Sequence, residues 1–440
     1  MYSEEIERML EKIGAKIGDK IRISKRGEVY EGILMPKSEF SDKKSIVIKL
    51  PSGYNVGVRY GEELKVEKLE GHKKVGFESR EIELKPVLGK PTISILSTGG
   101  TVASRVDYVS GGVYASYKAS DLIKIVPELR EIANINSKFV FGLMSEDLTV
   151  EHWRKMAREI AKELNSKTDG VVVTHGTDMM HFSTAAMSFM LKNLNKPVAF
   201  TGSQRSSDRG SSDGFMNLVC ASLFAAKSDV AEVCLVMHGS VNDDYCLAHR
   251  GTKVRKLHTS RRDAFKSIND EPIARIFANG KIEVLNKNYK KRGEGKVQVD
   301  DKLEEKVAMI KTYPNMNPEI FDFYIEKKYR GIVIEGTGLG HVPTTIEKFS
   351  LIPKIKEATE NGIAVCMTSQ CLFGRVHPFV YANLRRAYEA GAIYCEDMLP
   401  EVAYVKLMHV LGHTKEREEV IKLMLTNMAG EINSRGSVFE

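Results

Sequence analysis

The chain has 440 residues, of which 42% are hydrophobic, and its formal net charge is +7. A chain of this length is too long to fold around one ordinary hydrophobic core, so we expect two or three domains. The sequence contains no run of roughly 18 to 20 apolar residues that would cross a bilayer, and it does not begin with a basic and then apolar signal pattern. We therefore expect a cytoplasmic protein with no membrane partner. The positive charge is modest for this length and does not by itself indicate a nucleic-acid partner.

The six cysteines are scattered along the chain and form no Cys-x-x-Cys pair. This pattern favours buried thiols over a disulfide framework or a zinc site.

The first part of the chain predicts a small antiparallel β-barrel, which we assign to residues 1–88. Short segments with alternating apolar residues are separated by turn residues. These predicted strands are 20–24, 28–34, 45–50, 54–58 and 64–68. Such barrels bind RNA or protein, or simply pack against a neighbouring domain. The sequence leaves these alternatives open.

From about residue 91 the pattern changes to apolar strands that alternate with helices, which indicates a doubly wound α/β fold. The first α/β domain is assigned to residues 91–288. Thr149 is expected to cap a helix with one apolar stripe, formed by Trp153, Met156, Ala157, Ile160 and Leu164. The predicted strands of this domain are 93–96, 171–174, 198–200 and 233–237.

The polar segment 286–300 contains the basic run 290–293 and is interpreted as an interdomain linker with a solvated loop. A second α/β domain is assigned to residues 301–440. Its predicted strands are 307–310, 332–335 and 363–367, and its predicted helix is 400–411, ended by Gly412.

Two loops that follow buried strands carry the residues best suited to chemistry. Residues 98–101 read Thr-Gly-Gly-Thr, and residues 174–178 read Thr-His-Gly-Thr-Asp. An open parallel sheet binds its ligand beyond the carboxyl ends of its strands, so both loops are expected to face one pocket. Hydroxyl nucleophiles and glycine-exposed backbone amides are what acyl transfer requires.

Other site types fit less well. No strand is followed by a Gly-x-Gly-x-x-Gly fingerprint or a phosphate-binding loop, which argues against nucleotide binding by this chain. His175 and His181 are six residues apart, a spacing that common metal motifs do not use, so both are interpreted as structural. We predict neither a metal site nor a cofactor in this chain.

Residues 98–103 and 175–178 resemble the two signature motifs of the L-asparaginase family. The resemblance covers residues 91–440 and continues through segments 203–205, 335–340, 369–371 and 396–398. It implies an asparaginase-like pair of α/β domains. With the barrel ahead of them, the chain is similar to the glutaminase subunits of archaeal tRNA-dependent amidotransferases.

The resemblance implies a catalytic set. Thr101 matches the threonine nucleophile, which forms an acyl-enzyme, and Thr177 and Asp178 match the second threonine and its carboxylate. Lys256 matches the lysine that completes the set, with Lys253 as the alternative if the register shifts. A lysine beside Asp178 would keep the aspartate ionised and share the proton of Thr177.

The same resemblance places Gly100, Ser145, Glu146 and Gly176 at the substrate. Many asparaginases carry glutamine where Glu146 stands, so this carboxylate is expected to face the ammonium group of the substrate. The sequence does not single out the family's tyrosine near the nucleophile from Tyr108, Tyr114 and Tyr117.

The implied function is hydrolysis of L-glutamine, which supplies ammonia to convert Glu-tRNA(Gln) into Gln-tRNA(Gln). The implied partner is a kinase-like transamidase subunit of the GatE type that uses ATP and Mg²⁺, and the implied assembly is a homodimer within a heterotetramer. The alternatives are a free-standing L-asparaginase with an accessory barrel and a catalytically silent binding module. Glutamine and asparagine differ by one methylene, which an apolar site discriminates by about 1 to 3 kcal/mol, so the motifs do not fix the substrate.

Overall fold

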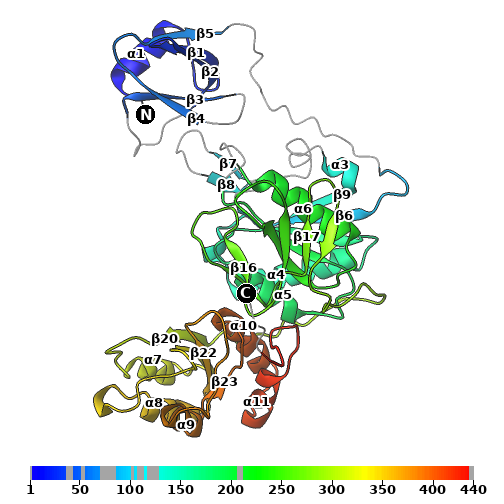
Figure 1. The fold of residues 1–440 in the computed structure, drawn as a ribbon, viewed down its shortest axis with the longest axis vertical. Helices are drawn as coiled ribbons and strands as arrows, with labels where there is room; N and C mark the ends of the chain where they lie inside the picture. Colours follow the sequence, from blue (N-terminus) through cyan, green and yellow to red (C-terminus); the bar gives the residue numbers. More distant parts are fainter. Residues whose placement is uncertain are drawn as a thin grey trace.

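The computed structural model describes residues 2–35, 43–50, 55–69, 86–100, 104–106, 113–115, 128–205 and 212–435. Three successive units follow one another along the chain, a small β-rich unit and two α/β units (Figure 1).

The first unit is a five-stranded antiparallel sheet in the order β4-β3-β2-β1-β5, so all five predicted strands are confirmed. The unit is not purely β, however, because α1 packs on the sheet and buries Ile6 and Leu10 with a one-turn spacing. The bounds are α1 Glu4–Lys12, β1 Lys20–Lys25, β2 Glu28–Leu34, β3 Ser45–Lys49, β4 Asn55–Arg59 and β5 Lys65–Lys68.

The second unit is built on an eight-stranded mixed sheet in the order β18-β17-β14-β13-β12-β10-β6-β9. Strands β9, β6, β10, β12 and β13 are parallel, and β14, β17 and β18 extend the sheet in antiparallel fashion. The four predicted strands are confirmed, whereas the antiparallel edge was not predicted. The bounds are β6 Thr92–Ser97, β9 Asn134–Phe139, β10 Gly170–Thr174, β12 Val198–Thr201, β13 Val233–His238, β14 Cys246–Arg250, β17 Ala274–Ile276 and β18 Ile282–Val284.

Helices cover both faces of this sheet. α4 (Val150–Leu164) and α5 (Met180–Met190) share one core with Leu96 and Val173, and α3 (Leu129–Ile132) and α6 (Gly214–Lys227) share the opposite core with Ile95. The chain winds from β6 outward to β9 and then continues from β10 in the other direction. The winding therefore reverses between β6 and β10, which is the point where doubly wound sheets bind their ligands.

The predicted helix after Thr149 is confirmed. The backbone N–H of Thr149 donates to Nδ1 of His152 over 3.1 Å, which fixes the first turn of α4. All five residues of the predicted stripe are buried.

The third unit has four parallel strands in chain order, with α7, α8 and α9 on one face and α10 on the other. The predicted strands are confirmed, and the predicted helix coincides with α10 and ends at Gly412. The bounds are β20 Val307–Lys311, β21 Gly331–Gly336, β22 Ala364–Ser369, β23 Ile393–Tyr394, α7 Ile320–Glu326, α8 Ile352–Glu360, α9 Ala382–Glu389, α10 Pro400–Leu411 and α11 Arg417–Leu425.

One hydrophobic cluster spans the two α/β units, in addition to a separate cluster within each of them. α10 packs on α5, and buried residues of α4, α5 and α10 form a single cluster. Aromatic contacts cross the junction, because Phe182 of α5 lies edge-on to Tyr404 of α10 with ring centroids 6.2 Å apart.

The segment predicted as a linker is partly buried and structured. The guanidinium of Arg292 donates to the backbone carbonyls of Ser228, Asp169 and Ala225, so the prediction of a wholly solvated basic loop is wrong at this residue. The unsatisfied carbonyls of neighbouring elements are what bind this side chain. The short strand β19 (Gln298–Val299) pairs with β11 (Leu191–Lys192) at the end of α5.

The remaining short elements are β7 Ser104–Val106, β8 Val113–Ala115, η2 Ser145–Asp147, β15 Val254–Lys256, β16 Phe265–Ser267 and η3 Glu347–Phe349. Among the helices described, none combines the length and apolar character that a membrane span requires. Five of the six cysteines are buried free thiols as predicted, and Cys371 differs because it is exposed.

Candidate active site

The loops after β6 and β10 are in direct backbone contact. Both the backbone N–H and the hydroxyl of Thr98 donate to the carbonyl of Thr174, over 3.0 and 2.9 Å. Gly100 has a φ of +86°, and a Cβ at this position would lie 2.6 Å from the carbonyl oxygen of His175. Only glycine fits so close an approach. The expected nucleophile, Thr101, follows Gly100 directly but lies outside the described residues.

The structure brings together Thr177, Asp178 and Lys256. Nζ of Lys256 donates to Oγ1 of Thr177 over 2.9 Å and to Oδ1 of Asp178 over 2.6 Å. The hairpin of β15 and β16 carries the lysine to this position, since Lys256 pairs with Phe265 at the end of β15. The lysine side chain is 10% exposed, whereas that of Asp178 is 64% exposed, so the pair faces solvent on the aspartate side.

The alternative lysine lies elsewhere. Nζ of Lys253 forms an ion pair with Oδ2 of Asp397 over 2.7 Å, and both side chains are almost fully buried. Burial lowers the pKa of Lys253, while the charge of Asp397 opposes this shift. Of the two candidates, Lys256 is therefore the one that contacts Thr177 and Asp178.

The loop expected to bind the substrate, which contains Ser145 and Glu146, lies beside Gly176 in the loop after β10. Ser145 is buried in η2, its Oγ accepts the backbone N–H of Met179 over 3.2 Å, and it donates to Oε2 of Glu146 over 3.3 Å. A Cβ on Gly176 would lie 2.9 Å from Cβ of Ser145. Glu146 is exposed, so its carboxylate is accessible to a cationic group from solvent.

Two polar residues behind the site were missed by the sequence analysis. Asp213, at the start of α6, accepts the backbone N–H groups of Gln204 and Arg205 over 3.0 and 3.1 Å. Asn217 donates to Asp213 and to the carbonyl of Gly202, over 3.0 and 2.9 Å. Thr177 packs directly against Gly202, since a Cβ on Gly202 would lie 2.9 Å from Cγ2 of Thr177. The hydrogen bonds of Asp213 and Asn217 therefore hold the loop after β12, against which Thr177 packs. The sequence did carry a signal for Asp213, because an aspartate directly before an apolar helical segment is typical of a helix N-terminus.

The two histidines near the site are buried and electrically neutral near pH 7. Burial lowers the pKa of His175 to about 4, although its contact with the carbonyl of Gly176 opposes the shift. Burial also lowers the pKa of His181 to about 3, and the charges of Arg255 and Lys256 add to this effect. The interpretation of both as structural residues stays a prediction.

The three tyrosines considered for activation of the nucleophile are not placed. Tyr108 and Tyr117 lie outside the described residues, as does the side chain of Tyr114.

Three family models match the chain. "Asparaginase, N-terminal" matches residues 92–290, "Glutaminase/Asparaginase C-terminal domain" matches residues 306–424, and "GatD N-terminal domain" matches residues 15–69. Each model falls on one of the three units of the fold.

Two solved structures share the α/β units. The thermostable L-asparaginase from Thermococcus kodakarensis superposes with a TM-score of 0.71 at 32% identity, and it covers 78% of this chain and 99% of its own. L-asparaginase I from Vibrio cholerae gives a TM-score of 0.68 at 29% identity, with the same coverage of 78% and 99%.

Relatives that match over the whole length include the first unit as well. The GatD protein of the glutamyl-tRNA(Gln) amidotransferase from Pyrococcus furiosus is 56% identical over 434 residues, which are 97% of each chain. The GatD protein from Methanothermobacter thermautotrophicus is 47% identical over 442 residues, which are 99% of this chain and 98% of the other. The predicted fold, an asparaginase-like α/β pair behind an added domain, is confirmed. The chain belongs to the GatD family of glutamyl-tRNA(Gln) amidotransferase subunits.

Proposed function

We propose that this chain is the glutaminase subunit of a tRNA-dependent amidotransferase. The observation that supports it most is the contact of Lys256 with both Thr177 and Asp178, at the winding reversal of the sheet and beside the loop that leads to Thr101. Relatives of matching length carry the amidotransferase name and share the domain that precedes the asparaginase-like units.

In the proposed reaction, Oγ of Thr101 attacks the side-chain carbonyl carbon of glutamine, and the carbon–nitrogen bond breaks. The hydroxyl proton leaves with the amide nitrogen as ammonia, and a γ-glutamyl ester remains on Thr101. Water then hydrolyses the ester to glutamate and restores the hydroxyl. Backbone N–H groups of the glycine-rich loops stabilise the oxyanion of each step.

Lys256, Thr177 and Asp178 handle protons in this scheme. The ammonium group of Lys256 donates a hydrogen bond to Oγ1 of Thr177. This hydrogen bond stabilises Oγ1 when the hydroxyl proton of Thr177 moves toward the substrate or the attacking water. Asp178 holds the lysine in place through the second hydrogen bond. The exposed carboxylate of Glu146 is assigned to the substrate ammonium group, with Gly100, Ser145 and Gly176 lining the same side.

Ammonia is the product that the assembly uses. We assign its consumption to a kinase-like transamidase subunit of the GatE type, which activates Glu-tRNA(Gln) with ATP and Mg²⁺ in the cytoplasm. We propose a homodimer of this chain within a heterotetramer, and no cofactor in the chain's glutaminase site.

The test is ammonia release from glutamine and from asparagine by the full chain, alone and with the partner subunit and Glu-tRNA(Gln). Slow glutamine hydrolysis that rises when both are added supports the proposal, and Thr101→Val should abolish it. Fast asparagine hydrolysis that is indifferent to both additions would show a free-standing asparaginase, a candidate favoured by the two solved L-asparaginases. No hydrolysis under any condition would indicate a silent binding module.

A further inference from the structure

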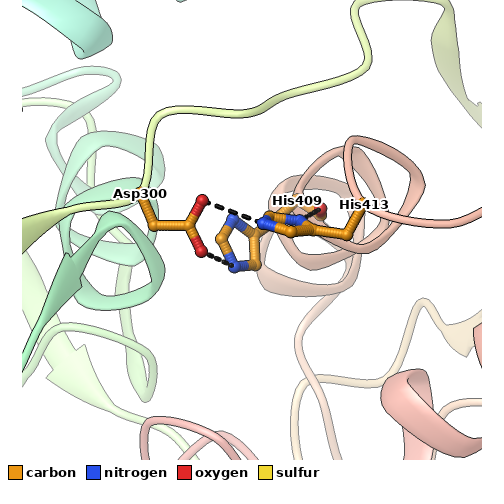
Figure 2. Close-up of side chains that lie close together, drawn as sticks. All are labelled: Asp300, His409 and His413. Atoms are coloured by element: carbon orange, nitrogen blue, oxygen red, sulfur yellow. Dashed lines mark hydrogen bonds and ion pairs between the residues drawn. The ribbon is translucent and has the colours of Figure 1, made fainter.

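Asp300, His409 and His413 lie together where the connection between the α/β units meets the end of α10 (Figure 2). Nε2 of His413 is 2.9 Å from Oδ1 of Asp300, and Nε2 of His409 is 3.6 Å from Oδ2. One side-chain atom of each residue lies within 4.8 Å of the other two. The His409 side chain is 4% exposed, so the cluster has a buried side and an open side.

The hydrogen-bond partners of the two rings indicate which nitrogens face the centre of the cluster. Nδ1 of His413 lies 2.7 Å from the carbonyl oxygen of His409, which only accepts, so Nδ1 carries a proton. Nε2 of the same ring lies 2.9 Å from Oδ1 of Asp300, and a metal ion bound here would take the place of the proton shared by these two groups. Nε2 of His409 presents a lone pair, because the ammonium group of Lys192, which only donates, lies 3.2 Å away.

The Nε2 atoms of two imidazoles and one carboxylate therefore converge on a common centre. The ammonium group of Lys192 already lies beside this centre, 3.2 Å from Nε2 of His409 and 4.0 Å from Oδ2 of Asp300. The lysine side chain is 39% exposed, so it is free to withdraw into solvent if a metal ion takes its place.

We propose that Asp300, His409 and His413 bind a divalent transition metal of the zinc class, separate from the glutaminase site. Two imidazoles and a carboxylate suit this metal, with water in the fourth position. Tetrahedral zinc with bonds of about 2.0 to 2.1 Å needs ligand atoms roughly 3.3 Å apart. One ligand atom of each residue already lies within 4.8 Å of the other two, so small side-chain rotations would bring the three to this spacing. The contact of His413 Nδ1 with a backbone carbonyl is the arrangement that orients metal-bound histidines.

A metal ion here would join the two α/β units. Asp300 follows β19, which pairs with β11 at the end of α5, and the histidines belong to the end of α10. The ion would fasten the connecting segment to α10 beside the α5 contact. This proposal differs from our expectation of no metal site. Asp300 precedes His413 by 113 residues, so no metal-binding motif of short sequence spacing contains both residues.

The test is a Zn²⁺ titration of the full chain against a chromogenic chelator, in a Cys371→Ser background that removes the exposed thiol. We expect one ion per chain. His413→Ala and Asp300→Asn should each weaken binding at least ~100-fold, since even indirect supports of a metal site cost 10- to 100-fold. His377→Ala, an exposed histidine outside the cluster, should bind as the parent does. Lys192→Ala should bind more tightly, because the competing ammonium group is gone.

Two further readouts separate a built site from surface binding. Zn²⁺ should raise the unfolding temperature of the parent and leave that of His413→Ala unchanged. Co²⁺ bound to the parent should show no thiolate-to-metal charge-transfer band. Equal affinity in the parent and His413→Ala would overturn the proposal and leave an imidazolium–carboxylate pair at this position. Glutamine hydrolysis is not the readout, so failure here leaves the proposed function intact.

Discussion

At the scale of single residues, the two lysines of one short segment have different surroundings and should have different roles. Lys256→Met removes both hydrogen bonds to Thr177 and Asp178. We expect glutamine turnover to fall by about 100-fold or more, the size of a lost proton-transfer group, with little loss of stability because Asp178 is largely solvated. Steady-state ammonia release measures the first effect, and urea unfolding measures the second.

Lys253→Met is the matched comparison. It leaves the buried Asp397 without its ion-pair partner, which costs about 3 to 5 kcal/mol of unfolding free energy. Trp153, the single tryptophan of the chain, lies in the shared core and reports the transition by fluorescence. A stable Lys253→Met protein without activity, beside an active Lys256→Met protein, would reverse the assignment of the two lysines.

Three buried histidines make stability depend on pH. Burial lowers the pKa of His175 to about 4, and those of His181 and His249 to about 3. The unfolded chain binds these protons near pH 6.5, whereas the folded chain does not. Each histidine therefore makes its full contribution to the free energy of unfolding above pH 6.5. As the pH falls toward the folded pKa, about 1.4 kcal/mol of this free energy is lost per pH unit for each histidine.

His249→Gln isolates one of these contributions away from the active site. A glutamine amide can replace the contact of His249 Nδ1 with Oγ of Ser267, which is 2.8 Å long. Urea unfolding at pH 5 and pH 6.5 should show a mean pH slope about 1 kcal/mol per unit shallower than in the wild type, because the unfolded histidine is half protonated at pH 6.5 and almost fully at pH 5. Parallel slopes would mean that His249 is protonated in the folded chain.

The residues of the site were predictable to different degrees. The 175–178 motif identifies Thr177 and Asp178 from local sequence, because both lie in one loop after a buried strand. The resemblance already favoured Lys256 over Lys253, and the structure separates them because only Lys256 contacts Thr177 and Asp178, a contact that depends on the β15–β16 hairpin. Asn217 was not predicted, because it supports the site through a hydrogen bond to the carbonyl of Gly202, 15 residues earlier, and local sequence patterns do not indicate such a contact.

At the scale of elements, the strands of the second unit that were predicted are those covered on both faces. β10 and β13 are buried along their whole lengths, so they appear as continuous apolar runs. β14 was missed because its buried positions include His249 and Arg250, which are polar in sequence and satisfied only by tertiary partners. Helix α10 was predicted because a proline begins it and Gly412 follows it.

The packing of α10 on α5 predicts that the two α/β units unfold together. Met408→Ala should cost about 2 to 5 kcal/mol, the range for a large apolar side chain removed from a core. Trp153 lies in the other unit, yet its fluorescence transition should shift by the full amount because both belong to one cluster. Glu418→Ala, on the exposed face of α11, should leave the midpoint unchanged. Separate transitions for the two units would contradict the shared core.

At the scale of the whole molecule, the first unit has a core of its own. Its buried cluster includes Tyr2, Ile6, Ile21, Ile46 and Val58, and contains no residue of the α/β units. The solved L-asparaginases superpose on the α/β part of this chain and cover 99% of their own length, so that part forms a complete enzyme fold by itself. The first unit is therefore expected to serve the assembly rather than the hydrolysis of glutamine.

Deletion of residues 1–88 tests this division. The truncated chain should keep the wild-type Trp153 unfolding transition and the wild-type rate of glutamine hydrolysis without partners, because neither depends on the separate core. It should lose the increase in hydrolysis that the partner subunit and Glu-tRNA(Gln) produce. Partner binding and tRNA affinity, measured separately, then distinguish a protein-binding role from an RNA-binding role. Equal stimulation, partner binding and tRNA affinity with and without residues 1–88 would exclude both roles and leave the unit as a packing domain.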